Sequence, residues 1–377
     1  MHVLFLASSS ILLNVLLSLR LYAGGCGNEK MGISWGQTAA EEAAHAAMVN
    51  CSGHGRAYLD GIVVDGKLIC ECNLCYSGPD CSVFSPDCPA DANDGDPLYM
   101  EEFWKERAAR SAVVVSAWHR MSYSYSFTEE YFRVSEELEK HIRMLHDVAG
   151  NAVTGGKYII CGAGATQLLN AAVHALSFQD PSSGSPARVV ASAPYYKSSS
   201  SRRVEFDGEA SVWSDIKETT VDMNIIEFVT SPSNPEGLLK GPVLSGHPNF
   251  KAIHDRAYYW PIFTPIPGPA DDDISIFTMS KLTGHAGSRF GWALVRDKEV
   301  YQRMAEYVNE NTAGTSKDTQ LRMLKILKVV LEDGGKEMFE FAHGVMSGRW
   351  DRLSKALAPS DRFSLQQTPA SYCTFLH

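Results

Sequence analysis

Apolar residues form short continuous runs that alternate with longer segments of helical spacing. Runs of this length are typical of strands buried on both faces, and they occupy residues 157–161, 187–192, 226–230, 274–279 and 291–296. Apolar positions at helical spacing occupy 168–176, 319–332 and 336–357, and acidic residues after Thr128 predict a further helix there. Strands that alternate with helices predict an α/β fold: a mainly parallel sheet covered on both faces, with a ligand at the carboxyl ends of its strands.

The run FTMSKLTGHAGSRFGWALV joins two of these strands and carries candidate chemistry. Lys281 follows Ser280, and Arg289 lies eight positions later among glycines. A lysine can form an imine with the aldehyde of pyridoxal 5′-phosphate (PLP), while a hydroxyl and a guanidinium bind its phosphate. Alone, a lysine in a glycine-rich loop is usually only solvated, so the PLP hypothesis needs further support.

Two upstream segments supply the other groups that a PLP site needs. In DRAYYWP, Asp255 can keep the pyridine nitrogen protonated and Tyr258 can donate to the ring 3′-oxygen. In TSPSNPEG, Asn234 precedes a proline in a turn, and its amide can also reach that oxygen. Each segment alone also fits an ordinary strand end or turn. Their common order along one chain favours a PLP site.

A glycine turn and an aromatic pair complete the predicted pocket. Between the strand at 157–161 and the following helix, Ala165, Thr166 and Gln167 place backbone N–H groups at a helix N-terminus, which suits a phosphate. The strand at 187–192 leads to two tyrosines. We expect Tyr196 to stack on the pyridine ring and Tyr195 to be a core or rim residue.

The chain resembles plant alliinases and the tryptophan aminotransferase-related proteins, which are fold-type I (aspartate aminotransferase-like) PLP enzymes. The resemblance covers nearly all of the chain after the first ~25 residues, and it rests on the segments CECNLCYSGPDCS, SAWHRMSY, GAGATQLL, SPSNPEGLL, DRAYYWP and SKLTGHAGSRFGWALV. It implies that Lys281 is the Schiff-base lysine, with the PLP ligands Asp255, Tyr258, Asn234, Tyr196, Ser280 and Arg289. Tyr123 matches a tyrosine that reaches the phosphate of the neighbouring subunit, which implies a homodimer.

The composition and the N-terminal segment limit the possible binding partners and the cellular compartment. The chain has 377 residues and a net charge of −10, which argues against nucleic acid as a partner. Residues 3–22 form a long apolar stretch followed by small residues, so we expect residues 1–25 to be a secretory signal peptide, with an uncleaved membrane anchor as the alternative. The expected location is the secretory pathway: the vacuole, the endoplasmic reticulum or the extracellular space.

Six of the nine cysteines lie in a short segment with little apolar pattern. They predict a disulfide-stapled module, with a zinc cluster as the competing interpretation, and we expect no metal because of the apparent signal sequence. Spacing alone leaves fifteen pairings open. The resemblance to the EGF-like subdomain of alliinases implies Cys51–Cys70, Cys72–Cys81 and Cys75–Cys88. Asn50 begins a glycosylation sequon. The expected domains are 26–92 for this module and 93–377 for the PLP-dependent domain.

The chain departs from the family in two places. Family members continue past His377, and no residue here matches their arginine that binds the substrate carboxylate. We therefore expect either an incomplete gene model or splice form, or a protein that has lost ordinary amino-acid binding. In addition, Asp94 precedes Gly95 where alliinases have a small hydroxyl residue near the substrate carboxylate. An aspartate there repels a carboxylate unless it faces solvent.

The resemblance implies an enzyme in which the freed Lys281 amine removes the Cα proton of an amino acid. Loss of a sulfur leaving group from Cβ makes the enzyme a carbon–sulfur lyase that cleaves S-alkyl-cysteine sulfoxides. Reprotonation at the cofactor makes it an aminotransferase of the tryptophan to indole-3-pyruvate type. The EGF-like module favours the lyase, and a catalytically inactive secreted protein is a third reading.

Overall fold

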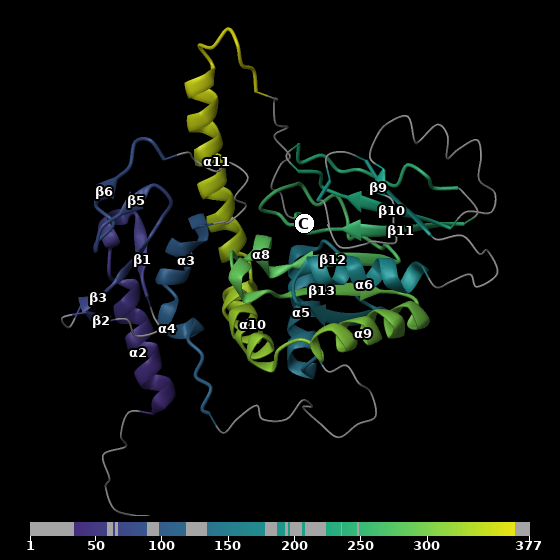
Figure 1. Ribbon diagram of the computed structural model, residues 1–377, viewed down its shortest axis with the longest axis horizontal. Helices are drawn as coiled ribbons and strands as arrows, with labels where there is room; N and C mark the ends of the chain where they lie inside the picture. The colour runs from purple at the N-terminus through teal and green to yellow at the C-terminus, as the bar shows by residue number, and fades with distance from the viewer. Residues whose placement is uncertain are drawn as a thin grey trace, which may run out of the picture.

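The computed structural model describes residues 34–58, 63–64, 67–88, 98–117, 134–177, 187–192, 195–196, 206–207, 224–234, 236–246 and 249–365 (Figure 1). A small N-terminal module lies to one side of a larger α/β domain, helices α3 and α4 lie between the two, and α2 lies below the strands of the module in this view (Figure 1). In the described residues, no helix is long and apolar enough to cross a membrane. The expected signal segment, residues 1–25, lies outside them.

Three disulfides hold the small module together: Cys51–Cys70, Cys72–Cys81 and Cys75–Cys88. These are the pairs that the resemblance to alliinases implied. Apolar burial contributes little here, since most side chains described between residues 51 and 88 are partly or fully exposed. The disulfides accompany a short helical turn and three two-stranded pairs: η1 Cys51–Gly53, β1 Gly55–Ala57 with β4 Cys70–Cys72, β2 Val63–Val64 with β3 Lys67–Leu68, and β5 Tyr76–Ser77 with β6 Val83–Phe84.

Three helices connect the module to the larger domain. Helix α2, Trp35–Ala47, precedes the cysteines, and the Ser34 hydroxyl caps it by accepting from the Gln37 N–H. The turn η2 Leu98–Met100 leads into α3 Glu101–Lys105 and α4 Ala108–Ser111. The Arg56 guanidinium of β1 binds the Glu101 carboxylate of α3, which joins the module to the helices that follow it.

The larger domain is built on a seven-stranded sheet. Its order is β7-β13-β12-β11-β10-β8-β9, and β13 alone runs antiparallel to the other six described strands. Strands β7, β8, β10, β12 and β13 lie where the apolar runs predict them, whereas β11 and the edge strand β9 were not among the predicted runs. Their bounds are β7 Tyr158–Gly162, β8 Arg188–Ala191, β9 Phe206–Asp207, β10 Ile225–Thr230, β11 Phe250–Asp255, β12 Ile274–Thr278 and β13 Gly291–Val295.

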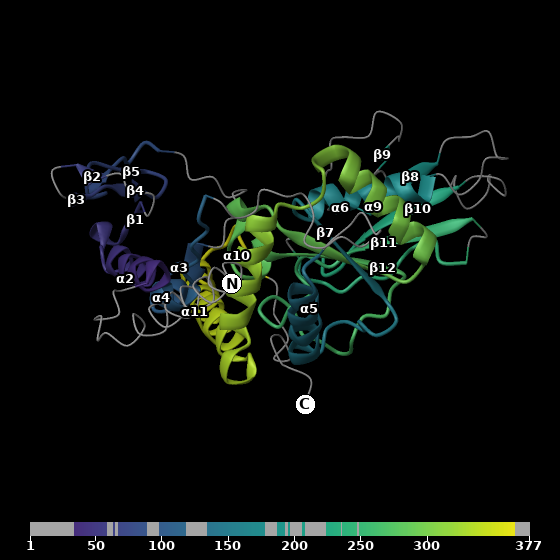
Figure 2. The same cartoon turned by 90° about the horizontal axis from the view of Figure 1, so that it is seen from below.

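Helices cover both faces of the sheet (Figure 2). On one face, α6 Ala165–Ser177 and α9 Lys298–Thr312 pack against strand residues such as Ile160, Ile253 and Ile276. On the other face, α5 Glu136–Ala149 and α10 Lys317–Val330 pack against Phe277 and Trp292. Because side chains alternate along a strand, the two faces receive different residues of the same strands. This arrangement confirms the expected mainly parallel sheet.

The long helix α11, Glu337–Leu357, packs only its first turns into the core, through Met338, Phe339 and Ala342. Helices α10 and α11 lie close to their predicted ranges, whereas α2 and α9 were not predicted. The acidic segment after Thr128 lies outside the described residues, and the next described helix is α5.

Candidate active site at the carboxyl edge of the sheet

The topology brings the predicted site residues to one edge of the sheet. Strands β7, β8, β10, β11 and β12 are parallel, so their carboxyl ends meet at the same edge, and antiparallel β13 begins there. Segments that lie far apart in sequence therefore converge. The predicted residues that follow those strands or precede β13 are Ala165, Thr166, Gln167, Tyr196, Asn234, Asp255, Tyr258, Ser280, Lys281 and Arg289.

Lys281 lies on α8, Met279–Leu282, a single helical turn directly after β12. The Thr278 hydroxyl caps this turn by accepting from the Ser280 N–H at 3.2 Å. Met279 and Leu282 are buried and fix the turn, while Lys281 is only partly buried. Its Nζ lies 5.8 Å from the ring centre of Tyr258. The turn therefore places the lysine near the ring of Tyr258, in the segment that follows β11.

Asp255 is the last residue of β11, and its carboxylate is buried. One oxygen, Oδ1, accepts from the Ala257 N–H at 3.0 Å. Burial raises the pKa of the Asp255 carboxyl to about 6, although the Ala257 N–H and the Arg256 charge oppose this. A cation placed beside this carboxylate would favour its ionised form. The position therefore suits a protonated ring nitrogen.

Asn234 and Tyr258 come together from two different loops. The Asn234 amide Nδ2 donates to the Tyr258 hydroxyl at 3.4 Å. Burial, and then the nearby Asp255 charge, raise the pKa of the Tyr258 phenol, so that it remains a hydrogen-bond donor. The two side chains thus offer donors at a common point close to Asp255, as expected for ligands of a phenolate oxygen.

Arg289 packs against the turn before α6. Gly164 has φ +80°, and a Cβ added there would lie 2.5 Å from Arg289 Nη2. A Cβ on Gly291 would lie 2.8 Å from the Ala165 backbone nitrogen, so both glycines are needed for this close approach. The guanidinium and the N-terminus of α6 together make an electropositive corner that suits a phosphate. The Ser280 side chain is buried near the same edge.

Two predicted ligands on α6 have protein partners in this structure. Gln167 Oε1 accepts from the Ala163 N–H at 2.7 Å, so this side chain holds the turn in place. The Thr166 hydroxyl lies 3.3 Å from the Tyr196 hydroxyl. Tyr196 is 58% exposed, and its stacking on a cofactor stays a prediction. Tyr195 packs against the α6 face of the core, as expected.

A pocket of about 590 Å³ adjoins the arginine end of the edge. Its lining comprises Ala163, the segment 287–289 and the loop 312–319. The volume lies in the range of small-molecule sites. The pocket reaches Arg289 but is not lined by Lys281 or Asp255, so the geometry of the converging residues, rather than this cavity, locates the candidate site.

Three predicted residues, Tyr123, Asp94 and Gly95, lie outside the described residues. Conversely, the structure gives roles to residues that were not singled out. Thr278 caps the lysine turn, and its position as a threonine before Met-Ser-Lys at a strand end is a recognisable capping signal. Among the described residues, no cluster of three His, Cys, Asp or Glu side chains suits a metal ion.

Comparison with known proteins places this geometry in a family. The family model described as "Allinase" matches residues 90–377, and the model "Alliinase EGF-like domain" matches residues 34–88. The chain belongs to the alliinase family. Tryptophan aminotransferase-related protein 3 of Arabidopsis thaliana is 50% identical over 382 residues, which cover 99% of this chain and 82% of that protein. Alliin lyase of Allium cepa is 46% identical, over 91% of this chain and 73% of that enzyme.

Among solved structures, the chain is similar to the methionine aminotransferase YbdL of Escherichia coli. The TM-score is 0.48 at 16% identity, and the match covers 71% of each chain. In this alliinase-family chain the disulfide-rich module precedes the α/β domain. Disulfides are typical of proteins in the secretory pathway or outside the cell.

Proposed function

We propose that this alliinase-family chain is a PLP-dependent enzyme of amino-acid metabolism whose site lies at the carboxyl edge of the sheet. One observation supports it above the others. Lys281, the buried Asp255 carboxylate and Arg289 on its glycine turn converge there from three strand ends. A structural protein would not require a lysine, a desolvated carboxylate and an anion site together.

Different residues would bind different parts of the cofactor. Asp255 keeps the proton on the ring nitrogen, and Tyr258 with Asn234 binds the 3′-oxygen. Arg289, Ser280 and the N-terminus of α6 bind the phosphate. When bound, PLP supplies an electron-withdrawing ring that acidifies the substrate Cα–H bond. Lys281 would hold the cofactor, and its free amine would carry a proton to or from the substrate Cα.

The main proposal is a carbon–sulfur lyase that acts on S-alkyl-cysteine sulfoxides. It is supported by the alliinase family match, by the EGF-like module and by the alliin lyase relatives. The alternative is an aminotransferase. It is supported by the 50% identity to two Arabidopsis thaliana proteins that are named as tryptophan aminotransferase-related. The described site residues serve both outcomes, because both begin with the same proton removal at Cα.

Cofactor fixation tests the shared part of the proposal. We expect the purified protein to absorb visible light when loaded with PLP, and borohydride to fix the cofactor on the peptide that contains Lys281. Lys281→Ala should abolish fixation, whereas Lys298→Ala on the surface of α9 should not. A colourless wild-type protein that takes up no PLP would refute both enzyme proposals.

Two product assays then separate the alternatives. Pyruvate released from an S-alkyl-cysteine sulfoxide, without any 2-oxo acid acceptor, supports the lyase. Indole-3-pyruvate formed from tryptophan only when 2-oxoglutarate is present supports the aminotransferase. Turnover of tryptophan with no release of pyruvate from any sulfoxide would contradict the main proposal.

The assembly and the compartment complete the proposal. A homodimer with shared sites follows from the expected role of Tyr123, and mixing inactive Tyr123→Phe and Lys281→Ala subunits should then restore part of the activity. We propose entry into the secretory pathway through residues 1–25, ahead of a module at 26–92 and a catalytic domain at 93–377. Asn50 is exposed, as a glycosylation site must be, and a mass shift on glycosidase treatment would show the glycan.

A further inference from the structure

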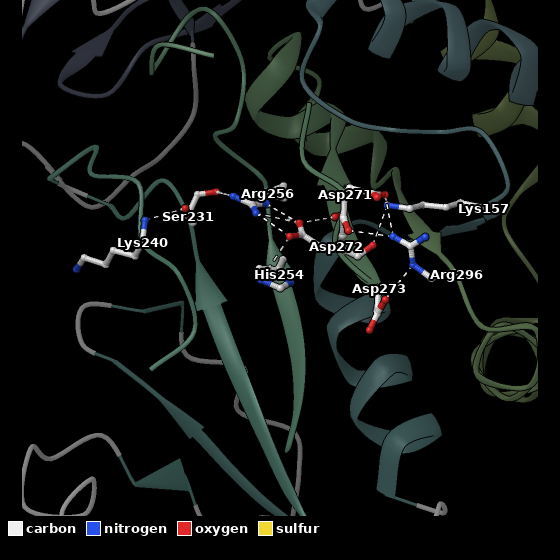
Figure 3. A network of polar contacts seen from close by, with 10 residues as sticks. Lys157, Ser231, Lys240, His254, Arg256, Asp271, Asp272, Asp273 and Arg296 are labelled. Carbon is white, nitrogen blue, oxygen red and sulfur yellow. Dashed lines mark hydrogen bonds and ion pairs between the residues drawn. The ribbon is translucent and has the colours of Figure 1, made fainter. Parts of the chain in front are cut away.

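A cluster of charged side chains gathers around the residues that precede β12, and it contributes none of the predicted ligands of the candidate site (Figure 3). Three consecutive aspartates, 271–273, precede β12 and meet cations from three other segments. Lys157 contacts Asp271, and Arg296 contacts both Asp271 and Asp273. The central aspartate, Asp272, instead faces Arg256, the residue that follows Asp255.

Arg256 makes a two-pronged contact with Asp272. Nε donates to Oδ2 at 2.9 Å and Nη2 donates to Oδ1 at 3.0 Å. The two side chains are only 11% and 14% exposed. Asp272 also accepts from the Ser275 hydroxyl at 2.8 Å, and His254 Nε2 lies 3.5 Å from Oδ1. The guanidinium is therefore held in one orientation by a largely buried carboxylate.

The third guanidinium nitrogen reaches the loop that carries Asn234. Nη1 of Arg256 donates to the Ser231 carbonyl at 3.2 Å, and the Ser231 N–H donates to the Asp255 carbonyl at 3.1 Å. The Ser231 hydroxyl accepts from the Lys240 N–H, which closes the other side of the loop (Figure 3). The segment between β10 and Asn234 is thus tied at its first residue to the end of β11.

We infer that Arg256 and Asp272 form a positioning pair that fixes the Asn234 loop relative to Asp255 and Tyr258. This inference rests on the proposed PLP site and adds residues that do not touch the cofactor. Asn234 meets the Tyr258 hydroxyl at 3.4 Å, so a small displacement of the loop would separate the two donors. Loss of the pair should therefore weaken binding at the 3′-oxygen, not only the stability of the fold.

Suitable variants must separate the loss of the Arg256 hydrogen bonds from the loss of its positive charge. Arg256 lies beside Asp255, and its charge favours the ionised form of that carboxylate. Lysine at position 256 keeps the charge but cannot make the planar contacts to both Asp272 and the Ser231 carbonyl. Glutamine at position 256 loses both. Arg296→Gln is the matched control, because Arg296 binds the same run of aspartates and, within the part of the chain that the structure describes, its polar contacts are with Asp271 and Asp273.

The experiment measures PLP affinity and the pH midpoint of the visible absorbance in the loaded proteins, with the thermal stability of each cofactor-free protein alongside. We expect Arg256→Lys, Arg256→Gln and Asp272→Asn each to weaken PLP binding by about tenfold, as for one lost charge-assisted hydrogen bond. We also expect the pH midpoint to rise by about one unit, since donors to the 3′-oxygen favour its deprotonated form. The double variant Arg256→Gln/Asp272→Asn should be no worse than either single variant.

The outcomes distinguish the inference from the proposed function. A wild-type protein that binds no PLP would overturn both. If wild type binds PLP while Arg256→Lys and Asp272→Asn keep its affinity and pH midpoint, the pair does not position the site. Equal losses in the Arg296→Gln control would also overturn the inference, because they would show a general effect of the charged cluster.

Discussion

Replacing His146 by glutamine tests how one buried imidazole makes stability depend on pH. His146 lies on α5, among the aromatic rings on the side of the sheet that faces α5 and α10. Its Nε2 accepts from Trp292 Nε1 at 2.9 Å, and its Nδ1 lies 2.8 Å from Asn151 Oδ1. An indole nitrogen can only donate, so Nε2 carries no proton and Nδ1 must be the donor to Asn151. The folded protein therefore holds this ring neutral.

The size of the pH effect on the free energy of unfolding follows from the shift in the His146 pKa. Burial lowers the pKa of His146 to about 4, against an ordinary value of 6.5. Between these values the unfolded chain binds a proton that the folded chain does not, so stability is lost as the pH falls from 6.5 towards 4. Each pH unit in this interval is worth about 1.36 kcal/mol. Lowering the pH to 5 should therefore remove about 2 kcal/mol from the free energy of unfolding through this residue alone.

The assay is urea unfolding of wild type and His146→Gln at pH 7.5 and pH 5, followed by tryptophan fluorescence and circular dichroism. Glutamine lowers stability at both pH values, because it leaves part of the aromatic cluster unfilled. Only wild type should lose the further ~2 kcal/mol on acidification. Other groups with raised pKa values, such as Asp255, are present in both proteins and cancel in the difference. Parallel losses of stability in the two proteins would refute the reasoning.

Three further changes test other parts of the structure. Gly164→Ala places a Cβ 2.5 Å from Arg289 Nη2, so PLP affinity should fall by at least about tenfold more than the affinity for pyridoxal, which lacks the phosphate; equal losses would contradict the phosphate role. Replacing Cys75 and Cys88 by serine opens a 13-residue link worth about 3 kcal/mol, and a protease should then cleave the module faster than in wild type. Glu227→Gln leaves one acceptor oxygen for the backbone N–H groups of Val243 and buried Leu244, and should cost about 1–3 kcal/mol in chemical unfolding; unchanged stability would show that the remaining oxygen or water is sufficient.

Local pattern was enough to predict most strands of the sheet interior, but not β11, whose first three residues are only partly buried or exposed. The segments of β12 and β13 are buried at every position, which produces the continuous apolar runs ISIFT and GWALV. Helix α9 was not predicted because only one stripe of it is buried, through Val300, Met304, Ala305 and Val308. Asp297 caps that helix by accepting from the Val300 N–H, so a capping signal was present in the sequence.

The candidate site could be predicted because its residues follow successive strands, and parallel strands place their carboxyl ends together. The contacts between individual side chains could not be predicted from the sequence. The pairing of Arg256 with Asp272 depends on how β11 lies beside β12, and that of His146 with Trp292 joins residues 146 positions apart. Such contacts arise from sheet register and packing, which no local periodicity encodes.

The alternation of side chains at the end of β11 explains why Asp255, the proposed partner of the cofactor ring, and Arg256, of the proposed positioning pair, can be neighbours in sequence. Ile253 packs on the α6 face, and Asp255, two residues later, points to the same face, where α6 and Arg289 form the anion corner. His254 and Arg256 share the opposite direction, and both meet Asp272. The Arg256 N–H still donates to the Ile276 carbonyl, so the strand pairing continues past Asp255 and keeps this alternation. One extended segment thereby directs Asp255 towards the proposed cofactor site on one side and Arg256 towards Asp272 on the other.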